Sequence, residues 1–142
     1  MSTRATYLFK AHNWTPEVCF YIHSDGYASG AAQYFYNAAH YYNFTAEGFI
    51  RGNVRAEFVG CHDTESDTEH HYTITGNNLV VMSREIIGGK RTWKKSFNGT
   101  VCDFINKNIN KERFSEGLPF SPIIEHNGEL MTERRLAIQS AA

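Results

Sequence analysis

Apolar and polar residues alternate with a period of two near the start of the chain, which is typical of β-strands with one buried face. Residues 3–11 and 17–23 show this alternation and are joined by a loop that contains Pro16, so together they predict a β-hairpin. In the second segment the side chains expected to face the core are Val18, Phe20 and Ile22. The opposite face, which is either solvated or covered by another segment, carries Cys19, Tyr21 and His23.

The period then changes to that of an α-helix. From Ser29 or Gly30 to about Asn43 the apolar residues recur at helical spacing, namely Ala31, Phe35, Ala38, Ala39 and Tyr42. The Ser29 hydroxyl is suited to cap this helix, because it can accept from the free amides of the first turn. Thr45 predicts a second, short helix that stops at Gly52-Asn53, and Thr100 predicts a third. The apolar stripe of the third helix is Val101, Phe104, Ile105 and Ile109.

Four further segments return to the period of a strand, namely residues 54–58, 70–75, 79–87 and 90–97. A polar connection over 60–69 separates the first of them from the other three. The last three predict a meander, because turn-forming residues stand between them, Gly76-Asn77-Asn78 and Gly88-Gly89.

This order of elements predicts an α+β fold, with a single antiparallel sheet of about five to six strands and two or three helices packed mainly on one face. The regular pattern fades after about residue 110, so we expect a core domain over 1–110 and a C-terminal arm over 111–142. Residues 114–124 of the arm are rich in apolar side chains, which pack on the core or on a second copy of the chain. On the second face of the sheet we expect a ring surface suited to binding, formed by Tyr7, Tyr21, Tyr72 and Trp93.

The charge and composition of the chain limit the classes of partner that we expect. The 142 residues carry a formal net charge of −1, with a pI near 6.6, so nucleic acid is a possible partner but not a favoured one. No apolar run approaches the ~18 residues of a membrane span. The start of the chain lacks the apolar core of a secretory signal, so we expect a cytoplasmic protein with no cofactor. Its three thiols, Cys19, Cys61 and Cys102, are expected to be reduced and mostly buried.

The first constellation with candidate chemistry is His23-x-Asp25-Gly26-Tyr27, which ends a strand and precedes a helix. A helix start binds anions, and an imidazole beside a carboxylate can act as an oriented base. The alternative is structural: Asp25-Gly26 forms a turn, and His23 bonds a neighbouring group.

The second constellation is the acidic and histidine-rich run from Cys61 to His71. Its carboxylates and imidazoles could hold a divalent metal, with His62, Asp63 and His70 as the candidate ligands. The spacing matches neither a zinc pattern nor the twelve-residue calcium loop. A solvated polar loop is the alternative interpretation.

The third constellation is a set of cations around Trp93 in the predicted hairpin, namely Arg84, Lys90, Arg91, Lys94 and Lys95. Cations that flank an aromatic ring can hold a phosphate and stack a base. Lysine on an exposed strand also prevents edge-to-edge pairing of sheets. The candidate binding residues are therefore those of the turn together with Tyr21, Arg91, Trp93 and Lys94.

No Walker A loop, GxGxxG, GxSxG or HExxH motif occurs in the chain. The opening Ser2-Thr3-Arg4 and the later His23-Ser24-Asp25-Gly26-Tyr27 resemble small uncharacterised proteins of phages and bacterial mobile elements. Ala28 stands where those proteins commonly have proline. The resemblance covers about the first 40 residues; it implies an accessory protein in the bacterial cytoplasm and supplies no catalytic residues.

Three functional hypotheses follow. The first is a non-enzymatic protein that binds a host protein or ribonucleoprotein complex, such as a CRISPR–Cas or other defence complex, as an inhibitor. The second is a nucleotide- or phosphate-binding domain or a metal-assisted hydrolase, which requires His23, Asp25 and the 61–71 loop to converge. The third is a homo-oligomer joined through residues 114–124.

Overall fold

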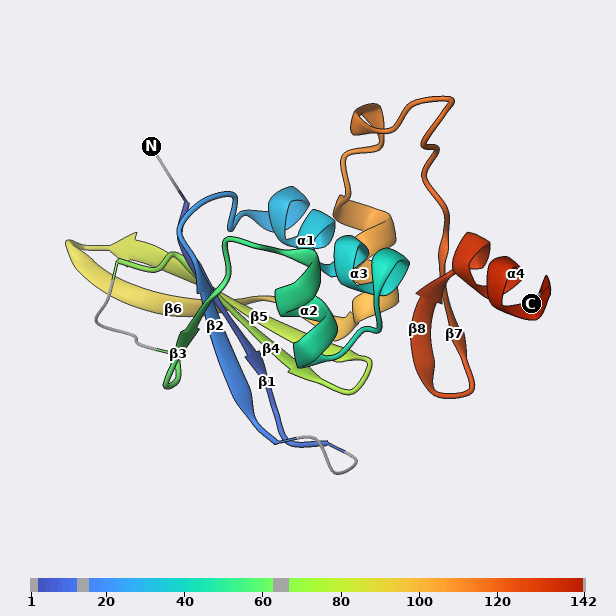
Figure 1. Cartoon of the computed structure of the whole chain (residues 1–142). Coiled ribbons are helices and arrows are strands. Elements are labelled where there is room, and N and C mark those ends of the chain that lie inside the picture. Colours follow the sequence, from blue (N-terminus) through green and yellow to red (C-terminus); the bar gives the residue numbers. More distant parts are fainter. Residues whose placement is uncertain (1–2, 13–15, 63–66, 142) are drawn as a thin grey trace. The chain divides into compact units, whose positions relative to one another are not determined.

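The structure, a computed structural model, describes residues 3–12, 16–62 and 67–141. The elements along the chain are β1 (Ala5–Phe9), β2 (Val18–Ile22), α1 (Ala28–Tyr41), α2 (Ala46–Gly52), β3 (Glu57–Val59), β4 (His70–Thr75), β5 (Asn78–Ile87), β6 (Lys90–Thr100), α3 (Val101–Asn108), the 3-10 helix η1 (Lys111–Arg113), β7 (Ile123–His126), β8 (Glu129–Thr132) and α4 (Glu133–Ala141). Figure 1 labels the helices and strands, which confirm the predicted α+β class.

The chain forms two compact units, each built from two separate stretches. The first comprises Met1–Tyr27 and Arg55–Val101 and contains the six-stranded sheet. The second comprises Ala28–Val54 and Cys102–Ala142, so the segment after residue 110 belongs to the same unit as α1 and α2. Within the described part of the chain, no helix has both the length and the apolar character needed to cross a membrane.

The sheet of the first unit is mixed. Its strands lie in the order β3-β2-β1-β4-β5-β6, and all neighbours are antiparallel except β1 and β4, which run parallel. The prediction of a wholly antiparallel sheet is therefore wrong at this pair. Since β3 and β4 run in the same direction on either side of β1 and β2, the chain between them has to cross both strands. The alternation of apolar and polar residues indicates which face of the sheet a side chain occupies. It does not indicate which strand is the neighbour in the sheet.

The core face of the sheet carries tyrosines that we had assigned to the other face. Tyr7 pairs with both Phe20 and Tyr72 in the strand register, so all three lie on one face. The Tyr7 and Tyr72 rings stack with centroids 4.9 Å apart, and all three side chains are buried. The core role of Phe20 and Ile22 is confirmed, whereas the predicted placement of Tyr7 and Tyr72 on a binding surface is wrong. Their aromatic rings supply the apolar contact that a core needs.

The third strand is shorter than its alternation predicts. Residues 54–58 were expected to form it, but Val54 and Arg55 form a turn and β3 spans only Glu57–Val59. Val54 and Phe58 are exposed, although the Phe58 ring approaches that of Phe20 with a centroid distance of 5.1 Å. β3 is an edge strand of the sheet, so it pairs with β2 alone.

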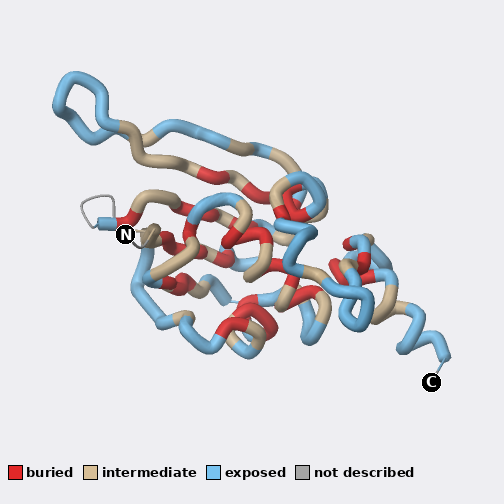
Figure 2. The backbone as a smooth tube through the Cα atoms, turned by 90° about the horizontal axis from the view of Figure 1, so that it is seen from above, coloured by how far each residue is buried: buried red, intermediate tan, exposed pale blue. Residues whose placement is uncertain are grey.

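The β5–β6 hairpin extends past its neighbour. The first residue of β4, His70, pairs with Ser83, and the Arg84 amide still donates to the Glu69 carbonyl, so residues 85–87 of β5 have only β6 beside them as a paired strand. The predicted turn at Gly88-Gly89 is confirmed, and both glycines have positive φ, as a two-residue hairpin turn requires. Figure 2 shows the exposed tip of this long hairpin.

The second unit is built around α1. The buried residues of this helix are small alanines and a glycine together with Phe35 and Tyr36. The Phe35 ring contacts the rings of Phe44, Phe49 and Phe104 at centroid distances of 5.8 to 6.0 Å. The helix begins at Ala28, so Ser29 lies inside its first turn and not before it. The predicted short helix is present as α2, and Thr45 caps it, because its hydroxyl accepts from the Gly48 amide at 3.1 Å.

The segment after residue 110 packs on α1. Phe114 and Phe120 both contact the Tyr36 ring, with centroids 5.2 and 5.4 Å away, and the Ser121 amide donates to the Tyr36 hydroxyl. The segment is not wholly extended, since β7 and β8 pair around Asn127-Gly128 and α4 follows them (Figure 1). The two positive φ values at this turn match an Asn-Gly hairpin, a signal that was present in the sequence.

Candidate functional site

The turn at residues 23–27 places its imidazole and its carboxylate in separate hydrogen bonds. The Nδ1 atom of His23 lies 3.3 Å from the donating Nε of Arg4 and 3.0 Å from the Tyr21 hydroxyl. The Asp25 carboxylate accepts from the Tyr27 hydroxyl at 3.0 Å. His23 is exposed, so it is accessible to a partner. None of these three contacts joins His23 to Asp25, so they do not make Asp25 the group that orients the imidazole.

Gly26 anchors this turn to the sheet. Its amide donates to the Thr3 carbonyl at 2.9 Å, and its own carbonyl accepts from the buried Tyr72 hydroxyl at 2.6 Å. A Cβ at this position would lie 2.7 Å from the Cβ of Ala5, so only glycine fits. The Asp-Gly pair therefore serves the packing of the first unit, which is the structural interpretation of the motif.

The connection between β3 and β4 is held against the sheet by His62. Its Nδ1 lies 2.6 Å from the Thr6 hydroxyl and its Nε2 lies 3.0 Å from the Thr73 hydroxyl. A neutral imidazole has one donor and one acceptor, and hydroxyls can serve both. Thr6 and Thr73 stand on the two central strands, β1 and β4, so His62 lies over the middle of the sheet.

Three rings are stacked at this place. The His62 and His71 centroids are 4.6 Å apart, and the His71 and Trp93 centroids are 4.0 Å apart, with interplanar angles of 9° and 19°. The buried Thr68 hydroxyl lies 3.0 Å from Nε2 of His71. We call His62, His71 and Trp93 the ring stack. It lies on the sheet face opposite Tyr7 and Tyr72.

The ring stack is built for a neutral imidazole. Burial, and then the neighbouring His71, lower the pKa of His62 from 6.5 to about 4. Burial also lowers the pKa of His70, although Glu69 opposes this effect. Both shifts favour the uncharged imidazole.

The proposed metal ligands do not come together in the described residues. His62 lies on the His71 face of β4, whereas His70 points to the opposite face, where its Nδ1 is 2.8 Å from the Ser83 hydroxyl. Asp63 lies outside the described residues. Within residues 3–12, 16–62 and 67–141, no group of three or more metal-binding side chains occurs.

The cations around Trp93 lie on the projecting hairpin. Lys90 and Arg91 pair with Ile87 and Ile86 across the two strands, and Trp93 pairs with Arg84. Lys94 lies 3.8 Å from Glu85, and Arg84 lies 3.9 Å from Glu69. His71 covers one face of the Trp93 ring, so that face is closed to a stacking base.

The hairpin tip combines these charges with an apolar pair that sequence reasoning did not select. Ile86 and Ile87 are 72% and 61% exposed, directly before the turn. The difference in strand length could have indicated their exposure. The ten-residue strand β5 is longer than its six-residue neighbour β4, so part of β5 has no partner on that side. We call Arg84–Ile87 and Lys90–Lys95 the tip surface.

The chain was compared with protein-family models, with curated proteins and with solved structures, and no match was found in any of the three.

Proposed function

We propose that the protein is a non-enzymatic accessory protein that binds an acidic surface of a partner protein through the tip surface. The observation that carries the proposal is the exposure of Ile86 and Ile87, which as strand neighbours point to opposite faces of the tip, with Arg91 and Lys90 directly across from them. On each face of the tip an exposed isoleucine stands beside a cation, which resembles the anchor and rim of a protein interface, so a partner that contacts both isoleucines has to hold the tip from two sides.

Charge complementarity favours an acidic partner. The tip surface contains five cationic side chains and one carboxylate, a formal charge of +4 on a chain whose net charge is −1. Opposite charges on a partner would steer the encounter and fix its register. The lysines also oppose edge-to-edge pairing with another sheet, so recognition through side chains is favoured over strand addition.

A protein fits the tip surface better than a nucleic acid does. Base recognition by stacking needs an open aromatic face, and one face of Trp93 lies on His71. Two side chains near the turn, Ile86 and Ile87, are aliphatic, and their removal from water by an apolar surface is favourable. These features support a protein partner.

The alternative, a phosphate-binding domain or metal-assisted hydrolase, receives less support. His23 and Asp25 have different hydrogen-bond partners, and His62 and His70 take opposite faces of β4. The N-terminal resemblance to phage and mobile-element proteins supports a partner in a bacterial host, such as a protein of a defence complex, with the chain acting as its inhibitor in the cytoplasm.

The test is affinity purification from a bacterial host, with mass spectrometry and three forms of the full chain. The double variant Ile86→Glu/Ile87→Glu is expected to lower recovery of the partner at least tenfold compared with the unsubstituted chain. The matched control is Ile138→Glu, which changes an isoleucine of similar exposure on α4, 66% compared with 72% and 61%. Thermal unfolding confirms that all three forms are folded. Equal recovery by the double variant, or no specific partner at all, would overturn the proposal.

A further inference from the structure

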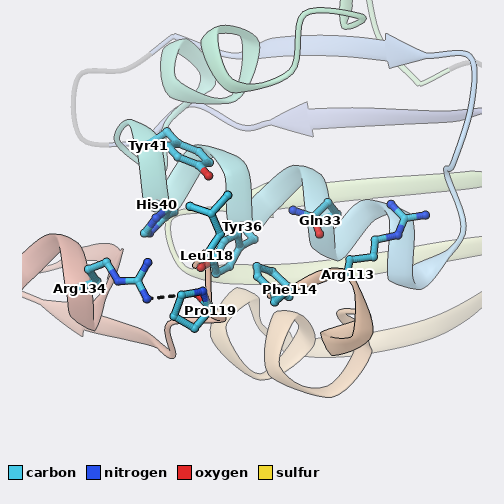
Figure 3. Close-up of a pocket in the computed structure, with 9 residues that line it drawn as sticks. All are labelled: Gln33, Tyr36, His40, Tyr41, Arg113, Phe114, Leu118, Pro119 and Arg134. Carbon is cyan, nitrogen blue, oxygen red and sulfur yellow. Dashed lines mark hydrogen bonds between the residues drawn. The ribbon is translucent and has the colours of Figure 1, made fainter. Parts of the chain in front are cut away.

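The second unit contains a cavity of about 270 Å³ that none of the predicted motifs includes. It is formed by one face of α1, by η1 with the chain that follows it, and by the start of α4 (Figure 3). Its lining residues are Gln33, Tyr36, His40, Tyr41, Arg113, Phe114, Leu118, Pro119 and Arg134. The volume is below the ~300–1,000 Å³ of sites for drug-sized molecules, so a smaller ligand would fit.

The middle of the cavity is aromatic. The Tyr36 ring is stacked on His40 at a centroid distance of 5.3 Å and on Phe120 at 5.4 Å, and it meets the edge of Phe114 at 5.2 Å, so Tyr36 is buried and supports the rings around it. The Tyr36 hydroxyl accepts from the Ser121 amide, which fixes the ring and the chain beside it. Leu118 and Pro119 add aliphatic surface, so the cavity offers a planar apolar body a preformed place.

The charged groups of the cavity are all cationic. Arg134 and Arg113 stand at opposite ends of the group of residues in Figure 3, with Gln33 beside Arg113. Arg134 donates one N–H to the Pro119 carbonyl at 3.3 Å, and a guanidinium has five. The nine lining residues include no aspartate or glutamate.

The pKa of His40 is sensitive to the electrostatic potential inside the cavity. Its Nδ1 lies 2.7 Å from the Thr132 hydroxyl, which holds the imidazole in place. Burial lowers the pKa of His40, and the positive charges of Arg134 and Arg135 lower it further. A bound anion would partly cancel that field.

We propose that this cavity binds a small organic carboxylate, with the carboxylate on Arg134 and the apolar body against Phe114, Leu118 and Pro119. Arginine is the side chain best matched to a carboxylate, because its planar fork can donate two parallel hydrogen bonds. The aromatic wall then selects carboxylates with a ring or a branched chain over small inorganic anions. The site is independent of the tip surface, which lies in the other unit.

The probe is benzoate, with benzamide as a neutral molecule of the same shape. Histidine ring resonances of the full chain are followed by NMR, and His40→Gln assigns the His40 signal. Benzoate is expected to shift this signal saturably at millimolar concentration and to raise the apparent pKa of His40, because a negative charge then lies nearby. Benzamide is expected to bind at least tenfold more weakly. Phenyl phosphate and inorganic phosphate form the comparison arms.

Two variants test the geometry. Arg134→Gln removes the charge and is expected to weaken benzoate binding at least tenfold. Leu118→Trp fills the cavity without removing a charge, and its control, Ile138→Trp, changes a residue of matching exposure outside the lining, 66% against 65%. Leu118→Trp is expected to abolish the shift and Ile138→Trp to preserve it. Equal binding of benzamide, a response to phosphates alone, or unchanged benzoate binding in Leu118→Trp would each overturn the proposal.

Discussion

The imidazole of His71 lies on the indole of Trp93, with ring centroids 4.0 Å apart and an angle of 19° between the planes. His62 lies on the other side of His71, so a ring from the β3–β4 connection, one from β4 and one from β6 form a single column. The column joins a crossing connection to two strands that are not neighbours in the sheet. We therefore expect it to stabilise the first unit.

This arrangement predicts that stability decreases in weak acid. His62 has a pKa of about 4 in the folded protein and about 6.5 when unfolded, so between these values the unfolded chain binds a proton that the folded protein does not. The free energy of unfolding should fall as the pH is lowered through this range. The full pKa difference corresponds to about 3 kcal/mol, and partial solvation of the ring reduces it to about 2 kcal/mol. Urea unfolding at pH 7.0 and 4.5 measures the loss.

The variant His62→Gln isolates this contribution. The lowered pKa values of His40 and His70 give a pH dependence of the same sign, so only the difference between variant and unsubstituted chain reports on His62. His62→Gln should reduce the loss between pH 7.0 and 4.5 by about 2 kcal/mol. The exposed His126→Gln serves as control and should leave the loss unchanged. Identical pH dependence of His62→Gln and the unsubstituted chain would show that the imidazole is not held neutral.

Glycine at position 26 is predicted to be required for stability. In Gly26→Ala the new Cβ would meet the Ala5 side chain at 2.7 Å and the Thr3 carbonyl oxygen at 3.0 Å, and both belong to the start of the sheet. Such overpacking costs about 1–3 kcal/mol. Gly60→Ala is the matched control, because nothing lies within 4 Å of its added Cβ, and its effect should stay within about 0.5 kcal/mol. Chemical denaturation measures both. Equal stability of the two variants contradicts this account of the turn.

The sequence predicted the elements well because their signals are local. The β4 strand, the Gly88-Gly89 turn and the cap of α2 all follow from periods and residue types within a few positions. The pairing of β1 with β4 depends on a crossing by the chain between β3 and β4, and no local period encodes such a path. For the same reason Tyr7 and Tyr72 were assigned to the wrong face, although each lies in a correctly predicted strand.

The candidate surfaces were harder to predict because they join distant residues. Lys90, Arg91 and Lys94 were selected from the sequence, but the exposure of Ile86 follows only from how far β5 extends past β4. The cavity brings α1 together with residues more than 70 positions later. Its cations, Arg113 and Arg134, lie in a segment where none of the signals that we used, its apolar side chains, prolines and turn residues, pointed to a charged site.

The docking of residues 114–121 on α1 can be tested at Tyr36. Tyr36→Phe keeps the ring that Phe114 and Phe120 contact but removes the acceptor of the buried Ser121 amide. An amide left without that acceptor is expected to cost about 1–2 kcal/mol. Tyr41→Phe removes an exposed hydroxyl on the same helix and should be neutral. Thermal unfolding measures the stability of both variants. If Tyr36→Phe is as stable as the unsubstituted chain, this hydrogen bond does not hold the segment on α1.

Thiol labelling gives the last prediction, because the three cysteines differ in environment. We expected mostly buried thiols, but Cys61 is exposed, Cys102 is half-buried and Cys19 is buried. Burial first, and then the charges of Cys61 and Glu17, raise the pKa of Cys19 to about 12, so its thiolate fraction at pH 8 is about 10⁻⁴. Timed iodoacetamide labelling with mass spectrometry of the peptides should find Cys61 modified at least about a hundredfold faster than Cys19. In urea all three should react, and Cys61→Ser should remove the fast phase. Rapid labelling of Cys19 in the folded protein would contradict its burial.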